Sequence, residues 1–114
     1  IDDFIENIDF KSLYNPKKKL LAIGMDKKGK SLNCYDMLIS EARLTSFIAI
    51  ALGKIPAEHW FSLSRPFTRV MEMPLCLSWS GTMFEYLMSD IFIKPTKETM
   101  LYNSSLMCVK AQMK

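Results

Sequence analysis

The sequence has no long hydrophobic run. Its longest uninterrupted apolar stretch, from Phe47 to Leu52, is only six residues, whereas a membrane-spanning helix needs about 20. Glycine is scarce as well, with four residues and no glycine-rich phosphate-binding loop. The sequence therefore predicts neither a membrane-spanning segment nor a nucleotide-binding loop.

Cysteine and histidine are too few to indicate a metal or disulfide scaffold. The three cysteines, Cys34, Cys76 and Cys108, are odd in number and make no C-x-x-C spacing. His59 is the one histidine; it has no partner at metal-ligand spacing, and we interpret it as a surface or helix-start residue. We expect reduced thiols, no metal and no cofactor.

The basic residues are unevenly placed. The net charge is only +3, but seven lysines lie in the first thirty residues. A nucleic-acid or anionic-membrane patch is one interpretation. No aromatic residues alternate with these lysines and no recognition helix accompanies them. We favour a solvated hairpin rim and expect no nucleic-acid partner.

The 114 residues suffice for one domain at most, and their pattern is mainly helical. A short apolar strand over 20–25 followed by a turn at Asp26–Gly29 predicts one small hairpin. Residues 65–74 are expected to form an irregular connection. Helices are predicted over 36–52, from Pro56 to Trp60 or Phe61, over 83–93 and over 99–114.

The predicted helix over 36–52 carries a carboxylate within an apolar stripe. Glu41 falls in line with Leu38 and Ile48 at helical spacing. Desolvation there would favour the protonated form, which a general acid needs. The alternative is a buried glutamate paired with an arginine for structural reasons. Asp36 and Arg43 share another face and are predicted to form a ladder through Ser40 or to contact sugar hydroxyls.

A second informative block reads Ser78-Trp79-Ser80-Gly81-Thr82-Met83-Phe84-Glu85-Tyr86-Leu87-Met88. Thr82 and Glu85 have the spacing of a capping box. The following helix is apolar on every side, which is typical of a buried helix. Trp79 and Tyr86 are expected to be core residues or to stack on pyranose rings.

Several blocks of the chain lie in an order that resembles the glycoamylase-like domain of bacterial cyclic β-1,2-glucan synthases. In chain order they are 20–24, Tyr35-Asp36, 40–44, 46–51, 53–56, 58–61, Arg65-Pro66 and 78–88. The resemblance covers roughly residues 8 to 93. It implies an all-helical α/α barrel that closes linear β-1,2-glucan into a ring by retaining transglycosylation. It also implies that Glu41 is the general acid/base and that the nucleophile belongs to a later serine–glutamate motif. Related proteins are endo-β-1,2-glucanases.

We therefore expect an all-α fold with at most one small hairpin, and residues 1–114 as the front portion of one α/α-barrel domain of a longer protein. The expected function is glycan processing, with ring closure favoured over hydrolysis. A catalytically inactive module that binds glycan or protein is the third alternative. The expected catalytic residue is Glu41, and the expected substrate contacts are Asp36, Arg43, Trp79, Glu85 and Tyr86.

The resemblance also implies partners and a location. The expected partners are β-1,2-glucan or a related polysaccharide, the remainder of the longer protein, and a second copy packed through exposed helices. A separate membrane-linked glycosyltransferase domain implies a cytoplasmic location at the bacterial inner membrane. Because the nucleophile is expected beyond Lys114, the isolated chain is predicted to be inactive.

Overall fold

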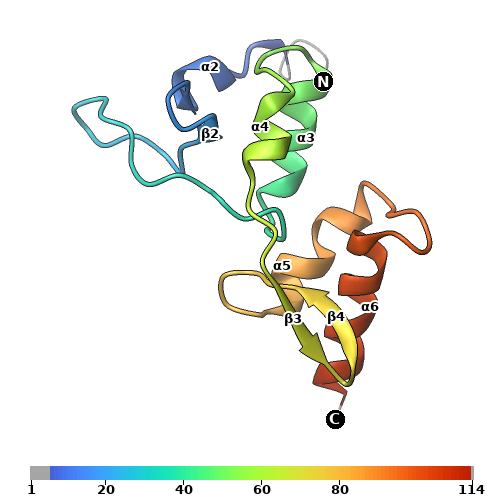
Figure 1. Ribbon diagram of the computed structural model, residues 1–114. Coiled ribbons are helices and arrows are strands. Elements are labelled where there is room, and N and C mark those ends of the chain that lie inside the picture. The colour runs from blue at the N-terminus through green and yellow to red at the C-terminus, as the bar shows by residue number, and fades with distance from the viewer. Residues whose placement is uncertain (1–5, 114) are drawn as a thin grey trace.

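The computed structural model describes residues 6–113, which form two lobes stacked end to end (Figure 1). The N-terminal lobe, residues 6–64, contains α2 (Phe10–Leu13), β1 (Tyr14–Asn15), β2 (Leu20–Leu21), α3 (Arg43–Ala51) and α4 (Glu58–Ser62). The C-terminal lobe, residues 65–113, contains β3 (Phe67–Val70), β4 (Met73–Cys76), α5 (Met83–Leu87), the 3-10 helix η1 (Ser89–Ile91) and α6 (Met100–Gln112). The radius of gyration is 15.2 Å, whereas a compact chain of this length has about 13 Å.

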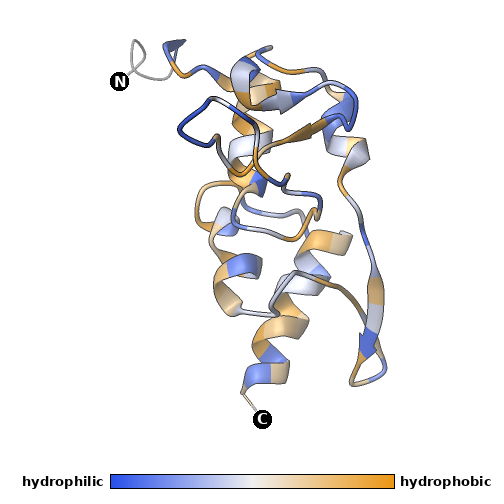
Figure 2. Ribbon diagram, turned by 90° about the vertical axis from the view of Figure 1, so that its left-hand side faces the viewer, coloured by the Kyte–Doolittle hydropathy of each residue, from blue (hydrophilic) through white to orange (hydrophobic). Residues whose placement is uncertain are grey.

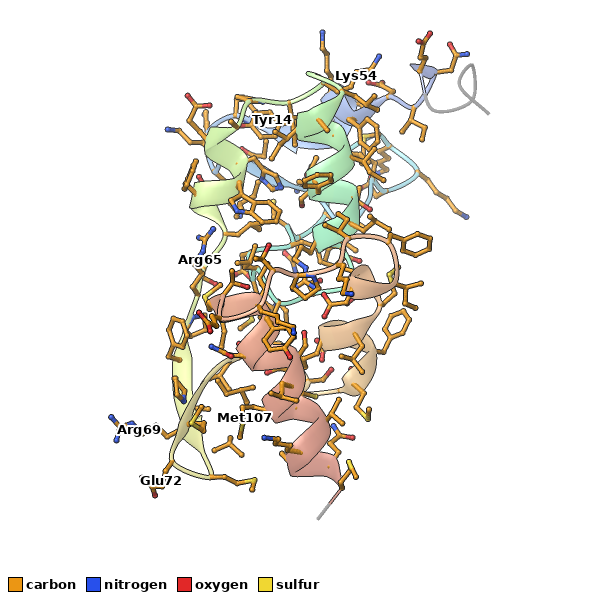
Figure 3. The ribbon with its side chains drawn as sticks, turned by 90° about the vertical axis from the view of Figure 1, so that its right-hand side faces the viewer. Tyr14, Lys54, Arg65, Arg69, Glu72 and Met107 are labelled. Atoms are coloured by element: carbon orange, nitrogen blue, oxygen red, sulfur yellow. The ribbon has the colours of Figure 1, made fainter. Side chains whose placement is uncertain are left out.

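The all-α prediction is wrong, because the fold mixes helices with two antiparallel two-stranded sheets, β1–β2 and β3–β4. The stretch expected to be irregular forms the β3–β4 hairpin, in which Phe67 pairs with Cys76. Its turn places Met71 and Glu72 at φ +52° and +63°. Such turns usually contain Asn or Gly, so the sequence carries no local signal for this hairpin. Glu72 lies at its tip (Figure 3).

The small hairpin after Leu21 is present in an irregular form. Its turn is confirmed: the amide of Gly29 donates to the carbonyl of Asp26 at 3.0 Å, and Gly29 has φ +74°. Isolated bridges join Ala22 to Cys34 and Met25 to Ser31 across the hairpin. The regular strand is shorter than predicted because only Leu20 and Leu21 pair with β1.

The predicted helix over 36–52 begins seven residues late, at Arg43. Residues 37–39 are extended instead, since Met37 pairs in parallel with Ser64 and Ile39 with Ser78. Leu38 and Ile39, each 1% exposed, pack into different clusters on opposite sides of the segment, as successive residues of a strand do. The predicted end is confirmed, because Gly53 follows α3 with φ +64°.

The two later helices differ in how well local pattern predicts them. The predicted helix over 99–114 is confirmed as α6, which begins after the capping residue Thr99 and consists mainly of apolar residues (Figure 2). The predicted helix over 83–93 ends at Leu87 and continues as η1. It is not buried on every side, because Phe84, Ile91 and Phe92 are 61%, 77% and 68% exposed.

In the part of the chain that the structure describes, buried side chains form three clusters rather than one core. The N-terminal lobe packs Phe10, Leu21, Ala49 and Ile55 together. The C-terminal lobe packs Ile39, Leu75, Cys76, Tyr86, Met107 and Cys108, with Met107 between α6 and the β3–β4 hairpin (Figure 3). Leu20, Leu38 and Leu63 form the third cluster. Among residues 6–113, no helix is long and apolar enough to cross a membrane.

His59 lies in the first turn of α4, as the helix-start alternative predicts, but it is fully buried, so the surface alternative is wrong. Its Nδ1 lies 2.9 Å from the carbonyl oxygen of Lys19, and its Nε2 lies 2.8 Å from the Ser46 hydroxyl. Burial lowers the pKa of His59, and the bond to the Lys19 carbonyl only partly opposes this. The imidazole therefore links α4 to α3 and to the segment before β2 in its neutral form.

The free energy of unfolding is expected to fall as the pH drops below about 6.5, the ordinary pKa of histidine. Because the folded-state pKa of His59 is lower than the unfolded value, the unfolded chain binds more protons in this window. Urea unfolding at pH 8 and pH 5.5 measures the decrease. Glutamine in the variant His59→Gln keeps one donor and one acceptor but does not titrate. The free energy of unfolding of this variant should therefore decrease clearly less between pH 8 and pH 5.5. Equal decreases in both proteins would contradict this role.

Candidate functional site

A hollow of about 620 Å³ opens where the two lobes meet, and we call it the Glu41 hollow. Its N-terminal side comes from the segment before β2, the hairpin that follows, and the extended segment before α3. Its C-terminal side comes from the Ser78–Met88 block. The residues that line it are Lys18, Leu20, Ile23, Asn33, Cys34, Tyr35, Asp36, Ser40, Glu41, Trp79 and Glu85.

Four of the six residues predicted for the site line this one hollow: Asp36, Glu41, Trp79 and Glu85. The parallel pairing of Ile39 with Ser78 brings the two segments that carry them together. The other two, Arg43 and Tyr86, are 4% and 2% exposed and are not among the lining residues.

Glu85 is held by the serine and threonine residues around it. The capping box is confirmed, because the Glu85 amide bonds the Thr82 hydroxyl while the Thr82 amide donates to Oε2 of Glu85 at 3.0 Å. The hydroxyls of Ser78, Ser80 and Thr82 also donate to Oε2, at 3.0, 2.8 and 3.0 Å, and the Ser80 amide reaches both carboxylate oxygens at 3.2 Å. Glu85 is 7% exposed. Its carboxylate is therefore buried and surrounded by donors.

These donors decide the charge of Glu85. Burial by itself would raise its pKa, but the bonds from Ser80, Thr82 and Ser78 outweigh burial and lower the pKa to about 2. The carboxylate is consequently ionised at neutral pH and cannot act as a general acid there. A carboxylate with so low a pKa is also a weak base, which favours a fixed negative charge beside the hollow.

Asp36 and Trp79 each present a group without a protein partner. One carboxylate oxygen of Asp36, Oδ1, is buried and accepts no hydrogen bond from the described part of the chain. The backbone carbonyl of Asp36 accepts from both the amide and the hydroxyl of Ser64 at 2.7 and 2.8 Å, which fixes this residue. The Trp79 side chain, in contrast, is 66% exposed. The lining of the hollow thus includes a carboxylate with one buried, unpaired oxygen, and one exposed indole.

Glu41 lies in a turn before α3, so the predicted apolar helical stripe around it does not exist. The turn is closed by the Arg43 amide, which donates to the Ser40 carbonyl at 3.1 Å. Glu41 is half-buried, and its Oε2 accepts from the Ser40 hydroxyl at 3.3 Å. It also lines a second, smaller hollow beside Leu13 and Met88. The residue therefore lies at the base of an open site on a short loop.

Arg43 and Tyr86 lie behind the hollow. Arg43 forms an ion pair of 2.6 Å with Asp90 and donates to the Tyr86 carbonyl at 3.4 Å, so the predicted ladder with Asp36 is absent. The Tyr86 hydroxyl donates to the Cys76 carbonyl at 2.8 Å. Both side chains are thus engaged with protein groups, and the sequence alone gave no indication of Asp90 as the partner of Arg43.

Within residues 6–113, no three His, Cys, Asp or Glu side chains come close enough to hold a metal ion. Cys34, Cys76 and Cys108 are free thiols, with Cys34 half-buried at the edge of the Glu41 hollow.

A hollow lined by carboxylates, apolar side chains and an exposed tryptophan is suited to a hydroxyl-rich ligand with apolar ring faces. No protein-family model matches the chain. The chain is 40% identical over 112 residues to "Cyclic beta-(1,2)-glucan synthase NdvB" of Rhizobium meliloti (strain 1021). The match covers 96% of this chain but only 4% of that protein. The chain is thus related to a small segment of a cyclic β-1,2-glucan synthase.

Proposed function

We propose that the chain is the front portion of the glycan-processing part of a cyclic β-1,2-glucan synthase. It acts on linear β-1,2-glucan and closes the polymer into a ring by retaining transglycosylation. The observation that carries the proposal is the Glu41 hollow, in which four residues expected at a glycan site lie together. The 40% identity over nearly the whole chain supports the choice of glucan.

Each residue of the hollow has a role in the proposal. Glu41 protonates the oxygen of the bond that breaks, and later takes the proton from the hydroxyl group that closes the ring. Trp79 stacks against a pyranose ring, and Asp36 accepts a bond from a sugar hydroxyl. Glu85 supplies a fixed negative charge that favours the cationic transition state. Arg43 and Tyr86 support the hollow from behind.

The proposal assigns the nucleophile to polypeptide outside this chain. Glu85 is unsuited to that step, because its low pKa and its many donors reduce its basicity. The exposed apolar side chains of Ile91 and Phe92, at 77% and 68% exposure, contact the remainder of the longer protein. That protein is membrane-associated through its other parts.

A hybrid protein tests the function. In it, this chain replaces the segment that it matches in the Rhizobium meliloti protein. The hybrid is expected to convert linear β-1,2-glucan to rings, detected by chromatography and mass spectrometry. Trp79→Ala should raise the KM for linear glucan about tenfold, as loss of a binding contact worth about 1.4 kcal/mol would.

Phe61→Ala is the matched control, since Phe61 is an exposed aromatic residue that does not line the Glu41 hollow. It should leave KM within about twofold of the unaltered hybrid. A folded hybrid that forms no product would contradict the proposal. Release of shorter linear chains alone would contradict ring closure and favour the endo-β-1,2-glucanase alternative.

A further inference from the structure

Asp90 connects three elements through its two carboxylate oxygens. Its Oδ1 pairs with the Arg43 guanidinium at 2.6 Å, and its Oδ2 accepts from the Ser105 hydroxyl at 2.6 Å. η1, which carries Asp90, is thereby bonded both to the start of α3 and to α6. Asp90 does not line the Glu41 hollow, and its side chain is 16% exposed. It can therefore affect the hollow only through the groups it holds.

Those groups lie on both sides of Glu41 along the chain. Arg43 follows Glu41 by two residues and is bonded to Asp90. Before Glu41, the carbonyl of Ser40 accepts from the fully buried Ser89 hydroxyl at 3.4 Å, and Ile39 pairs with Ser78. The loop that carries Glu41 is thus attached to residues 78–90, the same segment that carries Trp79 and Glu85.

Glu41 needs this support because its own surroundings fix it weakly. It lies outside any helix or strand, and its side chain accepts one long bond, from the neighbouring Ser40 hydroxyl at 3.3 Å. A general acid must lie within hydrogen-bond reach of the leaving oxygen, and a shift of about 1 Å costs about 100-fold in rate. We propose that Asp90, through Arg43, is a positioning residue that holds the Glu41 loop against the Trp79–Glu85 side of the hollow.

The inference rests on the proposed function, and its test separates positioning from stability. Asp90→Asn removes the charge but keeps the shape, so Arg43 is left buried without its partner. The double variant Arg43→Met with Asp90→Leu replaces the ion pair by apolar groups, an exchange that is often neutral or stabilising. Each variant is made in two proteins. In the hybrid we measure kcat and KM, and in the 114-residue chain we measure urea unfolding. Asp9→Asn, at the exposed cap of α2, is the control.

Asp90→Asn is expected to lower kcat about tenfold or more, with KM within about twofold, because binding through Trp79 remains. The double variant should recover the urea midpoint of the unaltered chain but not its kcat. Asp9→Asn should leave both unchanged. Recovery of kcat together with the midpoint would overturn the inference, since the pair would then be only structural. An unaltered kcat in Asp90→Asn would also overturn the inference.

Glu41→Gln, measured in the same hybrid, tells the two failures apart. If Glu41→Gln loses activity while the Asp90 variants do not, the positioning role fails and the proposed function stands. If Glu41→Gln keeps full activity, the proposed function of Glu41 fails, and the positioning role fails with it.

Discussion

Replacing Glu41 by glutamine in the hybrid is expected to lower the rate of ring formation by about 100-fold or more, as positioned acid–base groups typically contribute. Glutamine keeps the shape of the side chain and can still accept the 3.3 Å bond from the Ser40 hydroxyl. It cannot give up or take a proton. The measurement is kcat for conversion of linear β-1,2-glucan, with KM determined alongside.

The fold should survive this change, because Glu41 is half-buried at an open hollow and pairs with no basic side chain in the described residues. Glu58→Gln at the exposed first turn of α4 is the matched control, and we expect activity within about twofold of the unaltered hybrid. If Glu41→Gln kept full activity while Glu85→Gln abolished it in a folded protein, the roles of the two carboxylates would be reversed.

Glu85→Gln is expected to lower the free energy of unfolding by about 2 to 3 kcal/mol at pH 7. A capping-box partner alone would account for about 1 kcal/mol. The larger value is expected because the amide group of glutamine would place its own donors against those of Ser80 and Thr82, which now bond the carboxylate. Urea unfolding of the 114-residue chain measures the difference.

The pH dependence identifies the cause of that loss. The pKa of Glu85 is about 2 in the folded chain, below its ordinary value of about 4.3. The stability it contributes is therefore present above about pH 4.3 and is lost as the pH falls toward 2. Its size is on the order of 1 to 3 kcal/mol, because one pKa unit corresponds to about 1.4 kcal/mol.

The unaltered chain should thus lose more stability between pH 6 and pH 3 than Glu85→Gln does. The difference in free energy of unfolding between the two proteins should therefore narrow as the pH falls. Glu72→Gln at the exposed tip of the β3–β4 hairpin (Figure 3) is the control and should follow the unaltered chain. A constant difference between the unaltered chain and Glu85→Gln across this range would contradict the assigned pKa.

The part of the site that the sequence predicted best is the Ser78–Met88 block. Thr82 and Glu85 are three residues apart, so their reciprocal bonds depend only on the start of one helix. For Glu41 and Asp36 the sequence named the residues but placed them on a helix, and that helix begins only at Arg43. Their roles stay predictions.

The sequence by itself determined the features that depend on neighbours within one turn of the chain. These are the positive φ of Gly29 and Gly53, the start of α6 at its cap Thr99, and the Thr82–Glu85 capping box. Each is set by backbone conformation or by a bond between residues three or four apart.

Only the tertiary structure decided the extended course of residues 37–39, the β3–β4 hairpin, the burial of His59 and the pairing of Arg43 with Asp90. The partners in these contacts are mostly far apart in the sequence: Ile39 pairs with Ser78, His59 contacts Lys19, and Arg43 bonds Asp90. Local propensity over 36–42 favours a helix, but burying Leu38 and Ile39 on opposite sides requires extended backbone. Packing between the lobes overrode that propensity, and it is this packing that forms the Glu41 hollow.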